Sequence, residues 1–147
     1  GDVYKRQPNG NPREVISRDN LHTVYLWGYG DRYPIAEIKN ATLAQVEAAV
    51  SSIFGMTSSA LAQNSLPDAA KLKALRKHTS LSKAQVTVFT HLPLIGVSSV
   101  TDPTGKTLYY EYDELGRLKR NYYYENNIMQ ESEKRVLQEY DYHYRNQ

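Results

Sequence analysis

Two short stretches decide the fold, Asp102-Pro103-Thr104-Gly105 and Asp113-Glu114-Leu115-Gly116, which begin 11 residues apart. Each has Asp at the first position and Gly at the fourth position of a type I turn. The residues between them alternate as a half-buried strand does. The pattern therefore predicts consecutive β-hairpins, which is a structural repeat and not a catalytic motif.

The strands around these turns are rich in tyrosine. Nine of the 13 tyrosines lie in the last third of the chain: 109, 110, 112, 122, 123, 124, 140, 142 and 144. Two interpretations stay open. Rings on one face of the sheet stack across strands and stabilise it, or the outward rings of Tyr109, Tyr123 and Tyr144 offer an aromatic surface to a glycan or a protein.

The segment 110–118 resembles the YD repeat of RHS proteins, Tyr-x-Tyr-Asp-x-x-Gly-Arg-Leu. The residues that carry this resemblance are Tyr110, Tyr112, Asp113, Gly116, Arg117 and Leu118. A wider similarity to the C-terminal region of RHS/YD-repeat proteins of the Bacteroidetes type runs through residues 25–29, 33–38 and 93–97. Asp102 and Gly105 complete the repeat motif one hairpin earlier.

The resemblance implies a non-catalytic structural or interaction module, the terminal part of a larger cell-surface or exported protein. In that family the repeats coil a long β-sheet into a shell, which encloses a cargo domain in RHS toxins and supports adhesion in teneurins. The implied partners are the remainder of the repeat array and a protein or glycan. Two alternatives stay open: part of a polymorphic toxin, whose effector would need catalytic residues after the repeats, and a carbohydrate-binding module.

The chain divides into four regions. Residues 1–7 resemble a translated sequencing adapter, and we expect a disordered, non-native segment there. Residues 8–41 are expected to hold N-terminal strands, 42–84 a helical insertion, and 85–147 the YD-repeat-like β region. The predicted fold is thus mainly β with an α-helical insertion, a twisted antiparallel sheet of hairpins with a helix pair.

In the insertion, Thr42 and Gln45 form a predicted capping box, and Gly55 ends the first helix. Residues 56–65 are expected to be a polar connection, and Pro67 is expected to open a second helix that reaches His78 with Leu72 and Leu75 buried. The predicted strands are 13–17, 23–29, 34–39, 85–91, 96–101, 106–112, 117–124 and 136–144. In residues 125–128 a third Asp-x-x-Gly turn is missing, which leaves the register of the last strand pair open.

The composition excludes several classes of function. A formal charge of +2, or +1 without Asp2, Lys5 and Arg6, gives no electrostatic case for nucleic-acid binding. The sequence has no cysteine, and therefore no disulfide or thiolate metal site. It has no apolar run long enough to span a membrane.

The sequence shows no pattern of catalytic, cofactor-binding or metal-binding residues. No two of His22, His78, His91 and His143 have the spacing of a zinc motif. Calcium at Asp113 is weighed against a turn cap, and the turn cap is favoured because only Glu114 lies beside it. We therefore expect no enzymatic activity.

Overall fold

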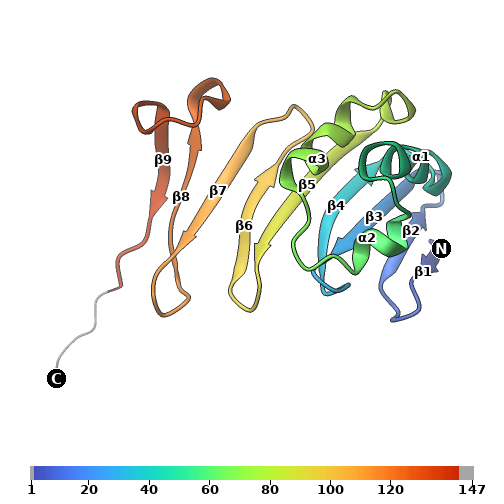
Figure 1. The fold of residues 1–147 in the computed structure, drawn as a ribbon, viewed down its shortest axis with the longest axis horizontal. Coiled ribbons are helices and arrows are strands. Elements are labelled where there is room, and N and C mark those ends of the chain that lie inside the picture. Colours follow the sequence, from blue (N-terminus) through green and yellow to red (C-terminus); the bar gives the residue numbers. More distant parts are fainter. Residues whose placement is uncertain (1, 143–147) are drawn as a thin grey trace.

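The computed structural model describes residues 2–142, which form a nine-stranded antiparallel sheet whose strands follow chain order (Figure 1). The strands are β1 (Val3–Arg6), β2 (Pro12–Ile16), β3 (His22–Gly28), β4 (Tyr33–Lys39), β5 (Gln85–Leu92), β6 (Gly96–Thr101), β7 (Thr107–Tyr112), β8 (Leu118–Tyr124) and β9 (Lys134–Glu139). The predicted mainly β fold with a helical insertion is confirmed.

The insertion joins β4 to β5, which are neighbours in the sheet despite the long connection between them. It holds α1 (Leu43–Phe54), α2 (Ser58–Ala62), α3 (Ala69–Ala74) and two 3-10 turns, Leu75–Lys77 and Thr79–Leu81. The capping box of α1 is present: the Gln45 amide donates to Thr42 Oγ1 at 3.2 Å, and the Thr42 amide donates to Gln45 Oε1 at 2.9 Å. Gly55 ends the helix at φ +69°.

Two expectations for the insertion are wrong. Residues 56–65 are not only a connection, because Thr57 caps α2 by accepting a hydrogen bond from the Ala60 amide at 3.1 Å. Pro67 does not open the second helix. Asp68 is the N-cap of α3 and accepts from the Lys71 amide at 3.2 Å, which leaves Pro67 outside the helix.

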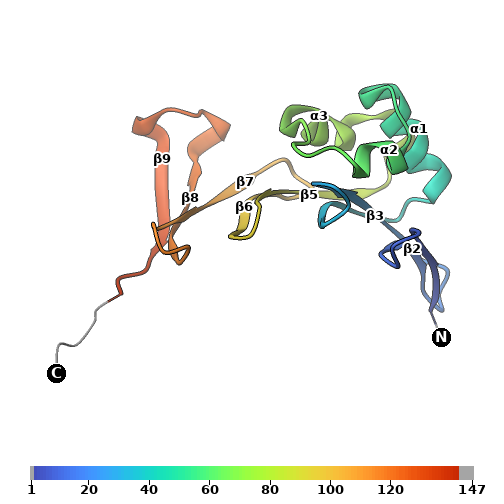
Figure 2. The ribbon, with the colours of Figure 1, turned by 60° about the horizontal axis from the view of Figure 1, so that its bottom comes forward.

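The main hydrophobic core lies between the helices and the middle of the sheet. Figure 2 shows the three helices on one face of the sheet, with β8 and β9 bending toward the same side. Buried side chains from both layers meet there, among them Leu26, Ile35, Ile38, Val46, Val50, Leu61, Leu72 and Leu75. Leu72 and Leu75 are buried, as predicted.

The expectation that residues 1–7 lack ordered structure is wrong for the described part of this segment. Val3–Arg6 form β1, which pairs with β2, and Lys5 Nζ lies 3.3 Å from Glu14 Oε1. The open backbone groups of an edge strand pair with any extended neighbour. The pairing of β1 with β2 therefore does not test whether residues 1–7 are native, and their non-native origin stays a prediction.

The last hairpin also differs from expectation. The predicted strand 136–144 begins earlier and ends earlier, as β9 (Lys134–Glu139), and Tyr144 lies outside the described residues. Lys134 pairs with Tyr124 and Val136 pairs with Tyr122, with a register shift between Asn121 and Tyr122. Two 3-10 turns, Glu125–Asn127 and Glu131–Glu133, replace the missing third turn.

Candidate functional site

The Asp-x-x-Gly turn is one of four turns with the same backbone. In each, the amide of the first residue donates to the carbonyl of the fifth, and the amide of the fourth donates to the carbonyl of the first. The turns span residues 7–11, 17–21, 102–106 and 113–117. The pairs that close them, Arg6 with Pro12, Ile16 with His22, Thr101 with Thr107 and Tyr112 with Leu118, have the same spacing.

Glycine is favoured at the fourth position because the backbone there is left-handed. Gly105 has φ +92° and Gly116 has φ +76°, so the positive φ predicted for Gly116 is confirmed. The two N-terminal turns have Gly10 at φ +93° and Asn20 at φ +61°. The sequence did not identify these turns as relatives of the repeat, since Gln7 and Ser17 stand in place of Asp.

The aspartates cap their own turns. Asp113 Oδ1 accepts from the Leu115 and Arg117 amides, both at 2.9 Å, while Arg117 Nε donates to Asp113 Oδ2 at 2.8 Å. The Arg117 amide is the main cause that lowers the pKa of Asp113. Asp102 Oδ1 likewise accepts from the Thr104 hydroxyl and amide, and the hydroxyl is the main cause that lowers the pKa of Asp102.

The other motif residues hold neighbouring strands together. Tyr112 donates its hydroxyl to the Val97 carbonyl at 2.8 Å, which ties β7 to β6. Tyr110 is half-buried opposite Asn121. Leu118 opens β8, and its carbonyl accepts the Tyr142 hydroxyl at 2.8 Å. These three contacts are structural.

An aromatic cluster lies at the other end of β7 and β8, on the face that carries the helices. The rings of Tyr109 and Tyr122 stack with centroids 5.4 Å apart and planes 14° apart. The Tyr124 ring meets both edge-on, with centroids 5.6 and 5.8 Å away. The stacking across strands that the sequence predicted is therefore present at these three rings. Burial raises the pKa of Tyr109 and of Tyr122 above the ordinary value of tyrosine.

The residues predicted to face a ligand do not share one surface. Tyr109 pairs with Tyr122, and Tyr123 projects to the opposite face because side chains alternate along β8. There Tyr123 lies under Lys106 Nζ, 4.2 Å from its ring centroid, and donates its hydroxyl to Glu125 at 3.2 Å. The expected joint surface of Tyr109, Tyr123 and Tyr144 is thus not formed by the described residues.

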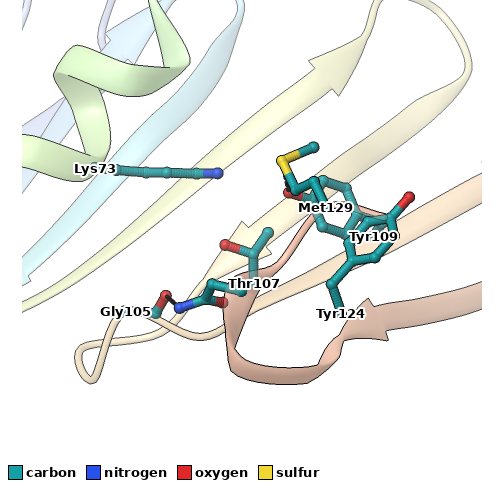
Figure 3. A pocket seen from close by; sticks show the side chains of 7 residues that line it. Lys73, Gly105, Thr107, Tyr109, Tyr124 and Met129 are labelled. Atoms are coloured by element: carbon teal, nitrogen blue, oxygen red, sulfur yellow. Dashed lines mark hydrogen bonds between the residues drawn. The ribbon is translucent and has the colours of Figure 1, made fainter. Parts of the chain in front are cut away.

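A pocket opens beside the aromatic cluster. Its volume is about 150 Å³, and it is lined by Lys73, Gly105, Thr107, Tyr109, Tyr124, Asn127 and Met129. Figure 3 shows Lys73 reaching from the helical insertion toward Tyr109 and Met129, with Thr107 and Gly105 below them in the view. Asn127 Nδ2 donates to the Gly105 carbonyl at 3.3 Å, which connects the β8–β9 loop to the 102–106 turn.

The sequence did not identify this pocket, because its walls come from three distant segments. Lys73 belongs to α3, Tyr109 to β7, and Met129 to the loop that departs from the repeat. Only the bend of β8 and β9 toward the helices brings them together (Figure 2). The missing third turn was the one available signal, since it marks where the chain stops following the repeat.

The described histidines have structural partners. His22 Nδ1 lies 2.9 Å from Glu14 Oε2, and His78 Nδ1 lies 2.8 Å from Ser80 Oγ. His91 Nε2 lies 2.6 Å from the Pro34 carbonyl, and its ring stacks on Tyr33. His143 lies outside the described residues. Within residues 2–142, no group of three or more His, Asp or Glu side chains is arranged to hold a metal ion.

No helix among the described residues is long and apolar enough to cross a membrane. Comparison of the whole sequence with protein-family models and with curated proteins gave no match to either.

Proposed function

We propose that this chain is a non-catalytic structural and interaction module of a larger RHS/YD-repeat protein at the cell surface or outside the cell. The rest of the repeat array is its first partner. The observation that carries the proposal is the recurrence of one turn geometry in the three hairpins outside residues 1–7, with turns at 17–21, 102–106 and 113–117, on both sides of the helical insertion. Repeat proteins are built in this way, from one supersecondary unit that cannot bury its own apolar face alone.

The sheet also has surface left for neighbours. Helices cover one face of β3–β5, and the opposite face has a row of half-buried apolar side chains. Phe89 lies opposite Val100, and Val100 lies opposite Leu108, in adjacent strands. Strands β1 and β9 each have a single neighbour in the sheet of residues 2–142. An unpaired strand edge is a template for another strand, so further repeats can continue the sheet.

Local chemistry supports the non-catalytic part of the proposal. Asp102 and Asp113 use their carboxylates to cap turns. His22 and His91 hold strands to their neighbours. These four side chains are thus engaged in contacts that hold turns and strands together. Export and a protein or glycan partner rest on the sequence resemblance.

Recovery of the natural gene around this segment tests the proposal. We expect the same reading frame to encode further Tyr-x-Tyr-Asp-x-x-Gly segments, spaced like the two turns in this chain. A frame without any such segment would contradict membership of a repeat array. In parallel, nuclease, protease or glycosidase turnover by the purified chain that disappears in His91→Ala would overturn the non-catalytic assignment.

A further inference from the structure

The pocket beside Tyr109 combines one cation with aromatic and thioether walls. Lys73 is the one charged residue of its lining. Within residues 2–142, no carboxylate lies within ion-pair distance of Lys73, whose Nζ is 5.9 Å from the Tyr109 ring centroid. Lys73 is half-buried, and an ammonium group without a carboxylate partner favours an anion.

The surrounding charges strengthen this preference. Lys134 Nζ lies over the Tyr122 ring of the same cluster, 4.2 Å from the centroid, and adds a second positive charge. Two acidic side chains of the neighbouring strands, Glu111 and Glu139, are both engaged by Arg120, at 2.6 and 3.1 Å. Lys73, Lys134 and Arg120 carry three positive charges against these two carboxylates, which leaves one net positive charge around the cluster.

The apolar walls of the pocket indicate which uncharged group the ligand carries. The rings of Tyr109 and Tyr124 and the thioether of Met129 line the pocket, and Tyr109 donates its hydroxyl to Met129 Sδ at 3.8 Å. Aromatic edges and sulfur both pack well against a planar ring. A cavity of about 150 Å³ holds a benzene-sized group.

We propose that this pocket binds a small aromatic carboxylate, with the ring against Tyr109, Tyr124 and Met129 and the carboxylate on Lys73. The site is independent of the proposed place in a repeat array. It requires only that α3, β7 and the β8–β9 loop keep their present positions, which the Arg76 and Asn127 contacts to residues 103–105 maintain.

The two methionines of the chain supply the test. Met129 lines the pocket, whereas Met56 packs against the core of the helical insertion. With ¹³C-methyl methionine, titration of the full chain with benzoate at constant ionic strength should shift the Met129 signal saturably and leave Met56 in place. Benzamide has the same ring without the charge. It should bind at least about threefold more weakly than benzoate, because it cannot form the half-exposed ion pair with Lys73.

Variants at Lys73 test whether its ammonium group binds the carboxylate of the ligand. Lys73→Gln should reduce benzoate affinity to that for benzamide, and Lys73→Arg should keep the preference. Lys77→Gln, on the same helical segment but outside the pocket, is the matched control and should change nothing. An unshifted Met56 signal in each variant shows that the insertion is still folded. No saturable Met129 shift, equal binding of benzoate and benzamide, or an equal loss in Lys77→Gln would overturn the proposal.

Discussion

The guanidinium of Arg76 packs against Gly105, so close that a Cβ on Gly105 would lie 3.1 Å from Arg76 Nη1. Arg76 also donates from Nε to the Pro103 carbonyl at 3.1 Å and from Nη2 to the Thr104 carbonyl at 3.0 Å. One side chain of the insertion thereby binds the backbone of the 102–106 turn. The absence of a side chain on Gly105 serves both the turn and this contact.

Loss of the Arg76 contact should loosen the turn from the insertion. Arg76→Ala should lower the free energy of unfolding by about 1 kcal/mol, since two charge-assisted hydrogen bonds at a half-exposed site are removed. Arg76→Lys keeps the charge but not the planar fork, and it should recover little of the loss. Chemical denaturation measures both variants. If lysine restored full stability, charge and not geometry would hold the turn.

Gly116 should tolerate asparagine but not valine. Its φ of +76° strains any β-branched residue, so Gly116→Val should cost about 1–3 kcal/mol. Asn20 occupies the matching position of the 17–21 turn at φ +61°, and asparagine visits this region more readily than other residues. Gly116→Asn should therefore cost less than Gly116→Val in thermal or denaturant unfolding. Equal stability of the two variants would mean that backbone strain is not the reason for glycine.

Sequence periodicity predicted the elements that local chemistry determines. Thr42, Gln45 and Gly55 bound α1 because capping groups act within a few residues of the helix ends. The repeat turns followed from Asp and Gly in the same way. The five-residue α2 is too short to show an apolar period, and its Thr57 cap alone did not distinguish a helix from a loop.

The pocket could not be predicted, because it depends on the curvature of the sheet. Alternation along β7 and β8 fixes which face each tyrosine takes once the register is known, and the register depends on the shift between Glu111 and Tyr112. No local pattern places Lys73 beside Tyr109. The order found at Val3–Arg6 likewise depends on the open β2 edge, with which the segment pairs, and on the contact of Lys5 with Glu14.

Glu14 should make the fold sensitive to acid. The side chain is 2% exposed, and burial alone would raise its pKa, but hydrogen bonds from His22, the Leu43 amide and Lys5 outweigh burial and lower the pKa below its ordinary 4.5. A lowered pKa means that the carboxylate stabilises the fold above pH 4.5 and that this contribution is lost as the pH falls through the folded-state pKa.

Glu14→Gln isolates this contribution. At neutral pH the variant should be less stable by about 1–3 kcal/mol, since the donors around Glu14 lose a charged hydrogen-bond acceptor. The difference from the unsubstituted chain should shrink below pH 4.5, where Glu14 becomes protonated first in the unfolded chain and then, at lower pH, in the folded chain. Denaturant unfolding over a pH series measures both. A difference that stayed constant with pH would show that packing, not ionisation, is responsible.

The free strand edges should cause the isolated chain to associate. Along β9, Val136 is 45% exposed and Leu137 is 58% exposed, and along β1, Val3 is 57% exposed. Each of these strands has one neighbour within the described sheet, so its outer backbone groups are open to another chain. Sedimentation velocity over about a hundredfold range of concentration should show a sedimentation coefficient that rises with concentration.

Leu137→Lys should reduce association because a lysine on an edge disfavours pairing. Leu94→Lys is the matched control: Leu94 is 89% exposed but lies in the turn between β5 and β6, away from both edges. If Leu94→Lys reduced association as much as Leu137→Lys, general surface hydrophobicity would be the cause, and a chain that stayed monomeric throughout would show that its edges are protected.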